Sequence, residues 1–175
     1  MQKRAEVVQA TVHRMSALKH ALQYAVDLTV SQGGRSMAAA GLEQEVVDAL
    51  QSACADAGVE LLTSRLRDHT GGFHTAVTSV DWGIAETGTL VLDSSDEELR
   101  LATMLAETHV ALLPVSHIMP DTESLENELD AVIKKDPSAY LAFITGASRT
   151  ADIERVLAIG VHGPQELHIL LMDGT

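Results

Sequence analysis

The sequence predicts an α/β fold in which helices cover a mainly parallel sheet. Apolar runs of strand length alternate with amphipathic segments of helix length along most of the chain. Alternation of this kind is typical of parallel strands joined by right-handed crossovers. Of the 175 residues, 46% are hydrophobic and only 3% are aromatic, so we expect a core of small and aliphatic side chains. The chain, 1–175, is long enough for one domain.

The first predicted element is a long helix over about residues 2–32. Its apolar residues recur at spacings of three and four, and they are Val8, Val12, Met15, Leu18, Leu22 and Val26. Two glycines, Gly33 and Gly34, end it. We expect this segment, 1–33, to pack on the domain, and it is the element suited to form a homo-oligomer with a neighbouring chain.

The middle of the chain reads as alternating short elements with polar or glycine-containing breaks. We first expect a weak strand at 36–40, a helix at 43–57 ended by Gly58, a strand at 59–63 and a loop at 64–75. Extended segments at 76–84 and 89–92 and an acidic loop at 93–98 follow. A helix near 99–106 then leads to a strand at 110–113 that is closed by Pro114. Asp121 or Thr122 then caps a helix with an apolar face. These elements supply most of the predicted sheet.

The last third gives the clearest pattern. An apolar strand at 139–144 is followed by a loop at 145–150, a short helix at 151–159, a second loop at 161–165 and a final strand at 167–172. No repeat, low-complexity tract or interdomain linker interrupts the sequence.

Composition excludes several classes of function. The chain carries 25 acidic and 12 basic side chains, a net charge of −13, which disfavours nucleic acid and anionic membranes as partners. No apolar run has the roughly 20 residues that span a bilayer, and the N-terminus lacks an export pattern, so we expect a cytoplasmic protein. A single cysteine, Cys54, precludes an iron–sulfur cluster or a cysteine-rich zinc site held by this chain alone. We expect its thiol to be buried and inert.

The first candidate site is a turn at Glu86, Thr87, Gly88 and Thr89 between two extended segments. Gly88 permits a positive φ or a close approach to the backbone. The two threonines offer hydroxyl groups, and Glu86 offers a carboxylate at a strand end, where α/β proteins bind ligands. The alternative is a hairpin turn with a solvated glutamate.

The second candidate site is the loop that contains Ser148, Arg149 and Thr150, followed by Asp152 and Glu154. A strand, a glycine-containing loop and a helix start bring free amides and a positive dipole together. The guanidinium of Arg149 is suited to bind a carboxylate or a phosphate. The alternative is a capped helix with an exposed arginine and two acids that suit its dipole.

The third candidate site is His162, which stands next to Gly163 on a short loop. An imidazole in this place could carry a proton or contact a ligand, and the alternative is a surface turn. The other histidines are scattered, and no pair has the spacing of a zinc protease helix. We predict no metal site, although a site built from the distant His74, His117 and His162 stays open.

The three candidate sites together resemble a known family. The segments GIAETGTLVL, ITGASRTADIE and GVHGPQELHILLMD, in this order and spacing, look like the lactate-utilisation (LUD) domain family, and within it the short, cluster-free protein C type. The match is strong over about residues 76–175. The family usually has proline where this sequence has Ala147, which loosens the loop before Ser148.

The resemblance implies a Rossmann-like three-layer sandwich of the NagB/RpiA/CoA-transferase-like superfamily. It also implies a part in oxidising L-lactate to pyruvate with iron–sulfur partner proteins. It groups Glu86 and His162 as proton-transfer residues. The ligand-binding residues that it implies are Thr87, Gly88, Thr89, Ser148, Arg149, Thr150, Asp152, Glu154 and Gly163. We expect redox cofactors to reside on the partners. The alternative is a non-catalytic module that binds an anionic ligand such as a nucleotide, a CoA-like molecule or a sugar phosphate.

Overall fold

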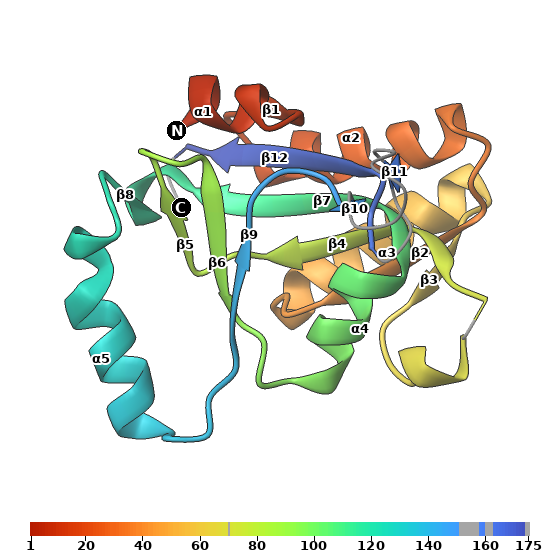
Figure 1. Cartoon of the computed structure of the whole chain (residues 1–175). Helices are drawn as coiled ribbons and strands as arrows, with labels where there is room; N and C mark the ends of the chain where they lie inside the picture. Colours follow the sequence, from red (N-terminus) through yellow and green to blue (C-terminus); the bar gives the residue numbers. More distant parts are fainter. Residues whose placement is uncertain (70, 151–157, 160–162, 174–175) are drawn as a thin grey trace.

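A computed structural model of the chain describes residues 1–69, 71–150, 158–159 and 163–173. Its centre is a six-stranded sheet in the order β1-β12-β7-β4-β2-β3, in which all neighbouring strands are parallel (Figure 1). The strands are β1 (Ala10–Met15), β2 (Ser36–Ala40), β3 (Glu60–Leu62), β4 (Phe73–Ser79), β7 (Ala106–Pro114) and β12 (Glu166–Met172). The predicted α/β class with a parallel sheet is confirmed.

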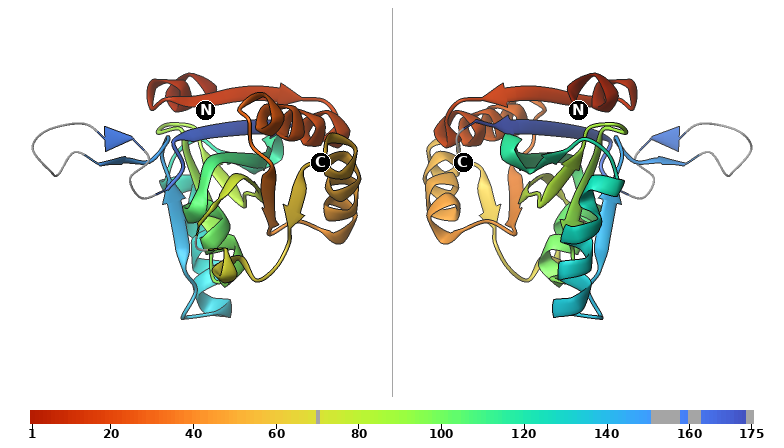
Figure 2. Two further views of the ribbon diagram at one scale, coloured as in Figure 1. Left: turned by 90° about the vertical axis from the view of Figure 1, so that its right-hand side faces the viewer. Right: turned by 90° about the vertical axis from the view of Figure 1, so that its left-hand side faces the viewer.

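Two helices, α2 (Leu18–Ser31) and α3 (Gln44–Ala57), cover one face of this sheet (Figure 2). Leu22 of α2 and Leu50 of α3 pack with Met37, Val77 and other buried side chains of the strands. Helix α3 ends where Gly58 adopts φ +68°, as the sequence predicts. Because many of the packed side chains are small, the helices lie close to the sheet. The core is therefore well buried although it contains almost no aromatic rings.

The opposite face carries a second, smaller sheet in the order β8-β5-β6-β9. Its strands are β8 (Ile118–Met119), β5 (Trp82–Ile84), β6 (Thr89–Asp93) and β9 (Leu141–Ile144). Pairing is antiparallel for β5 with β6 and for β6 with β9, and parallel for β5 with β8. Helix α4 (Glu97–Leu105) lies beside this sheet, and both pack on the large sheet through one apolar cluster.

Helix α5 (Glu126–Lys135) follows the 3₁₀ turn Glu123–Leu125. Leu125 of the turn and Leu129 of α5 pack with Ile84 and Val91 of the small sheet. The predicted apolar face of the helix is used only in part, because Ile133 is 50% exposed. Asp121 accepts hydrogen bonds from the amide (2.8 Å) and the hydroxyl (2.7 Å) of Ser124. Two further 3₁₀ turns lie at Leu66–Asp68 and Val115–His117.

The predicted long helix over residues 2–32 is wrong. The segment forms helix α1 (Gln2–Val7), strand β1 and helix α2. Gln9, with φ +66°, separates α1 from β1, and β1 pairs with β12 along its whole length. Strand β1 covers the edge of the buried strand β12, and the gain from this pairing outweighs the helical spacing of the apolar residues in β1. The apolar side of α2 is buried inside this chain, so it is not the free face on which an oligomer was expected.

The last third departs from the prediction as well. Arg149–Thr150, expected in a loop, forms strand β10, and Ala158–Ile159, expected at the end of a helix, forms strand β11. The two pair in antiparallel fashion. The rest of the predicted helix, 151–157, lies outside the described residues.

Candidate functional site

The turn of the first motif contacts the loop of the second motif through hydroxyl groups. Glu86, Thr87 and Gly88 join β5 to β6. The Oγ1 atoms of Thr87 and Thr89 are 2.7 Å apart, and Thr89 Oγ1 lies 2.8 Å from Thr145 Oγ1. The antiparallel pairing of β6 with β9 produces this contact, because it sets Leu90 opposite Ile144.

Gly88 serves the packing of helix α1. Its φ is +73°, and a Cβ atom at this position would lie 2.4 Å from the backbone nitrogen of Ala5. The sequence suggests that this glycine permits either a turn with positive φ or a close approach to the backbone. Gly88 does form such a turn, and the group that approaches its Cα closely is the backbone of helix α1. Glu86 is exposed, and its amide donates to the carbonyl of Pro120 at 3.0 Å.

The second and third motifs also meet. The amide of Ser148 donates to the carbonyl of Pro164 at 2.8 Å. Gly163 has φ +120°, and a Cβ atom there would lie 3.3 Å from the Cβ of Ser148. Arg149 and Thr150 are placed by their backbone in β10, opposite Ile159 and Ala158. Asp152, Glu154 and His162 lie outside the described residues.

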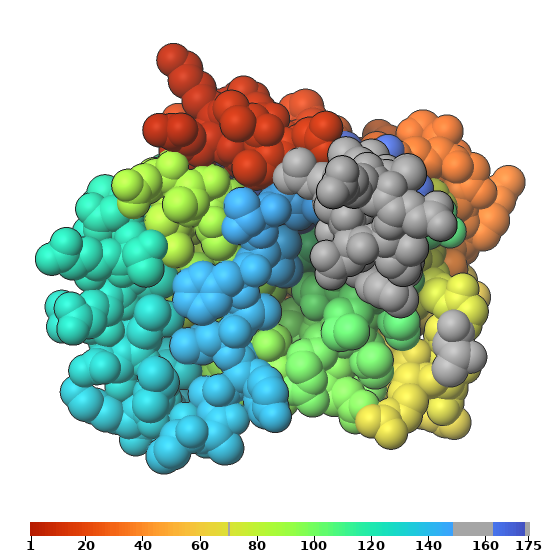
Figure 3. Space-filling model, in the orientation of Figure 1, coloured from red at the N-terminus to blue at the C-terminus, as the bar shows by residue number. Residues whose placement is uncertain are grey.

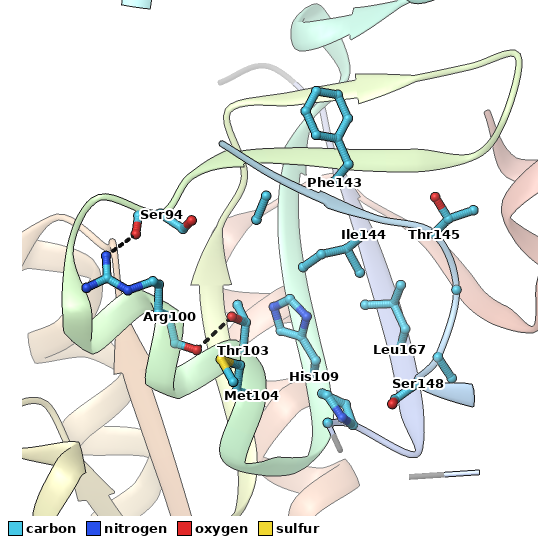
Figure 4. A pocket seen from close by; sticks show the side chains of 15 residues that line it. Ser94, Arg100, Thr103, Met104, His109, Phe143, Ile144, Thr145, Ser148 and Leu167 are labelled. Atoms are coloured by element: carbon cyan, nitrogen blue, oxygen red, sulfur yellow. Dashed lines mark hydrogen bonds between the residues drawn. The ribbon is translucent and has the colours of Figure 1, made fainter. Parts of the chain in front are cut away.

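A cavity of about 620 Å³ adjoins these loops, between strand β9 and helix α4 (Figures 3 and 4). We call it the β9–α4 cavity. Its lining consists of Ser94, Arg100, Thr103, Met104, His109, Ala142, Phe143, Ile144, Thr145, Gly146, Ala147, Ser148, Gly163, Pro164 and Leu167. Ser148 and Gly163 are the predicted site residues in this lining. Glu86, Thr87, Gly88 and Thr89 are not part of it.

The cavity borders the first half of β7 and of β12, at His109 and Leu167. Ligands of open α/β sheets usually bind at the carboxyl ends of the strands, which is the opposite end of this sheet. The small sheet accounts for the difference, because β9 and α4 extend over this part of the large sheet and form two walls above it (Figure 4).

His109 forms part of the cavity floor and is 1% exposed. Its Nε2 lies 2.8 Å from Oγ1 of Thr78 on the neighbouring strand β4. Burial lowers the pKa of His109 to about 4, so its ring is neutral at pH 7 and offers one donor and one acceptor. Sequence reasoning placed this histidine among the scattered ones. Its position beside the apolar run 110–113 was the available signal, because parallel strands are buried on both faces.

Arg100 of α4 is the only charged side chain among the described residues that line the cavity. Its Nη1 donates to the carbonyls of Ser94 (2.5 Å) and Ser95 (2.7 Å), and its guanidinium lies 5.5 Å from the ring centre of Tyr140. These contacts fix a cation at the wall of a largely apolar cavity (Figure 4). The sequence offered no motif around this arginine.

The described residues contain no cluster of histidine, cysteine and carboxylate side chains that could hold a metal ion. His74 is bonded to Thr75 Oγ1 at 2.9 Å, and His117 contacts the carbonyl of Asp81 at 2.9 Å beside the small sheet. Cys54 is fully buried, with its Sγ 3.7 Å from the sulfur of Met37. Burial raises the pKa of this thiol to about 11, which agrees with the predicted inert cysteine.

The fold and a cavity lined by residues of the second and third motifs define a class of protein: a parallel α/β domain with a second, smaller sheet that forms a ligand-sized pocket. A profile of the LUD domain matches residues 1–172. The chain therefore belongs to the LUD domain family, and the resemblance found in its motifs is confirmed.

Curated relatives carry the name lactate utilization protein C. The chain is 34% identical to the one from Anoxybacillus flavithermus over 114 residues, which are 63% of this chain and 50% of the relative. It is 40% identical to the one from Geobacillus thermodenitrificans over 94 residues, 51% of this chain and 39% of the relative. The chain spans about half the length of the curated relatives that it matches.

A crystal structure of a DUF162 family protein from Deinococcus radiodurans has a similar fold. It superposes with a TM-score of 0.64 and 19% identity, over 97% of this chain and 92% of that one. Within the described residues, no helix is both long and apolar enough to cross a membrane.

Proposed function

We propose that this chain is the cluster-free component of a lactate-utilisation system, supporting oxidation of L-lactate to pyruvate with iron–sulfur partner proteins. The names of the curated relatives support this role. Oxidation of lactate releases two electrons and two protons, and the partners' clusters would accept the electrons. In this proposal the chain is one cytoplasmic LUD domain over 1–175, and its fold belongs to the NagB/RpiA/CoA-transferase-like superfamily.

The observation that carries the proposal is that one cation, Arg100, and one neutral imidazole, His109, line the same β9–α4 cavity. Arg100 offers a guanidinium for a carboxylate, and apolar walls strengthen such a pair. The neutral ring of His109 can form a hydrogen bond with a hydroxyl group. L-lactate presents both groups, a carboxylate and a secondary hydroxyl.

The motif residues keep the roles that the resemblance implies as proposals. Ser148 and Gly163 line the β9–α4 cavity, which supports their place in the ligand site. Arg149, Thr150, Asp152 and Glu154 are proposed ligand-binding residues, as are Thr87, Gly88 and Thr89. Glu86 and His162 are proposed to transfer protons.

Growth on L-lactate tests the role. Deletion of the gene, in a strain that has no second copy, is expected to abolish growth on L-lactate and to leave growth on glucose unchanged. Return of the gene should restore it. Undiminished growth of the deletion strain on L-lactate contradicts the proposal.

The size of the cavity favours a second candidate function, a module that binds a larger anionic ligand without catalysis. Lactate has only six non-hydrogen atoms and would leave most of the 620 Å³ cavity empty. Calorimetric titration with ADP, coenzyme A, ribose 5-phosphate and L-lactate separates the two. Binding of one of the three larger anions and not of lactate supports the second function.

A further inference from the structure

Strand β9 is the last strand of the small sheet, and the β9–α4 cavity lies along the edge of β9 that pairs with no strand of the described residues. We propose that this cavity binds an extended peptide segment of a partner protein, which pairs with β9 as an added strand and places a carboxylate on Arg100. The inference rests on the proposed function, because it requires that this chain act together with partner proteins, and the added strand would compete with L-lactate for Arg100.

The backbone of β9 is arranged to pair with a further strand. Pairs of opposite residues in an antiparallel ladder alternate between hydrogen-bonded and non-bonded. The amide of Ser94 donates to the carbonyl of Tyr140 at 2.7 Å, so the alternation turns the amides and carbonyls of Leu141 and Phe143 away from β6. In the described part of the chain, these outward groups have no hydrogen-bond partner.

The cavity lies against this edge of β9. Four consecutive β9 and loop residues, 142–145, line it, and consecutive residues line a cavity together when the strand presents its edge, since side chains alternate between faces. Thr103 and Met104 of α4 form the opposite wall. A slot between an edge strand and a helix is the geometry in which proteins bind extended peptides by strand addition.

The rim of the cavity is apolar and exposed. Phe143 is 50% exposed and Met104 is 62% exposed, on opposite sides of the cavity. Natural proteins protect open sheet edges with charged side chains, with proline or with a covering segment. The segment Leu141–Ile144 contains neither charge nor proline. A peptide that lies along β9 would cover both rim residues and would form hydrogen bonds with the outward amides and carbonyls of β9.

Charge selects the kind of segment. The chain has 25 acidic and 12 basic side chains, yet the one charged residue in the described lining is Arg100. Its Nη1 is used by two carbonyls, whereas Nε and Nη2 have no partner among the described residues. A carboxylate of the added strand, from aspartate, glutamate or a C-terminus, complements this guanidinium.

A phage-displayed library of random decapeptides, selected on the purified full chain, tests the proposal. We expect selected peptides without internal proline and with at least one acidic residue. Calorimetry should then show that Arg100→Gln weakens a selected peptide by about tenfold or more, while Arg100→Lys retains most of the affinity. Failure to select any peptide, or selected peptides that bind equally to Arg100→Gln, would overturn the proposal.

The backbone contribution has its own test. Peptides N-methylated at alternate amides should lose binding in one of the two registers only, because an added strand uses alternate groups. Phe143→Pro removes an outward amide and should abolish binding, whereas Phe143→Ala should weaken it less; circular dichroism checks that both variants fold. Equal binding of both methylated forms contradicts strand addition.

The two proposals can fail separately. If growth on L-lactate requires the gene but no peptide binds, the docking proposal alone fails. If peptides bind but growth is independent of the gene, the proposed function fails.

Discussion

His109 is kept neutral by burial, and its protonation should therefore control stability in mild acid. Its pKa is lowered to about 4 in the folded chain from an ordinary value near 6.5. The unfolded chain binds the proton first, so stability is highest above pH 6.5 and falls as the pH drops below it. Between pH 7.5 and pH 5 we expect a loss of about 2 kcal/mol in the free energy of unfolding.

Urea unfolding of the wild type and of His109→Gln at both pH values measures this loss. The variant should lack about 2 kcal/mol of the pH dependence. The chosen range lies above that of the carboxylates with lowered pKa values, such as Glu166 and Asp173. An equal loss in both proteins would show that His109 does not carry the effect.

Gly88→Ala should destabilise the protein more than its backbone angle alone explains. The new Cβ would meet the Ala5 backbone nitrogen at 2.4 Å, and φ is +73°. Gly58→Ala is the matched control, because φ is +68° there and nothing lies within 4 Å. We expect a loss of about 1 kcal/mol at Gly58 from the backbone conformation, and at least about 2 kcal/mol more at Gly88. Thermal or urea unfolding measures both, and equal losses would contradict the close packing of α1.

At the residue scale, the motif residues could be predicted and the cavity residues could not. Ser148 and Gly163 stand in sequence patterns that a family resemblance makes visible. Arg100 and His109 lie on α4 and β7, and they line one cavity because the small sheet folds back over the large one. A single sequence carries no signal for such long-range placement, although a histidine in an apolar strand is a useful warning.

At the element scale, β1 shows how periodicity misleads. A spacing of four, as between Val8 and Val12, places two residues on one side of a helix and also on one side of a strand. Among the six apolar residues of the predicted stripe, only Met15 departs from the even spacing of a strand, and Met15 is the last residue of β1, before the separate helix that begins at Leu18. Helix α3, whose apolar residues keep one consistent period, is predicted at 43–57 and observed at Gln44–Ala57.

Helix α2 is joined to β12 by a polar contact that also can be tested. The hydroxyl of Tyr24 lies 2.8 Å from Nδ1 of His168, whose Nε2 lies 3.0 Å from Glu166. His168 is 6% exposed, so Tyr24→Phe should cost about 1 kcal/mol in the free energy of unfolding. Tyr140→Phe, at a side chain 66% exposed, should cost less than about half of that. Equal effects in urea unfolding would show that the contact contributes nothing.

At the scale of the whole molecule, the parallel sheet was predictable and the second sheet was not. Alternating helices and strands fix the first through crossover rules. The second is made from short segments between β4 and β7 and between β7 and β12, whose pairing partners are far apart in sequence. This added layer creates the β9–α4 cavity, so the fold class alone does not locate the site.

The central claim is that the β9–α4 cavity performs the function of this chain through its single described cation. Its most direct test is growth on L-lactate of a deletion strain that carries Arg100→Gln, beside a strain that carries Arg35→Gln, where an exposed arginine is removed. Immunoblots confirm equal amounts of both proteins. We predict that Arg100→Gln fails to restore growth and that Arg35→Gln restores it fully. Wild-type growth with Arg100→Gln would contradict the claim.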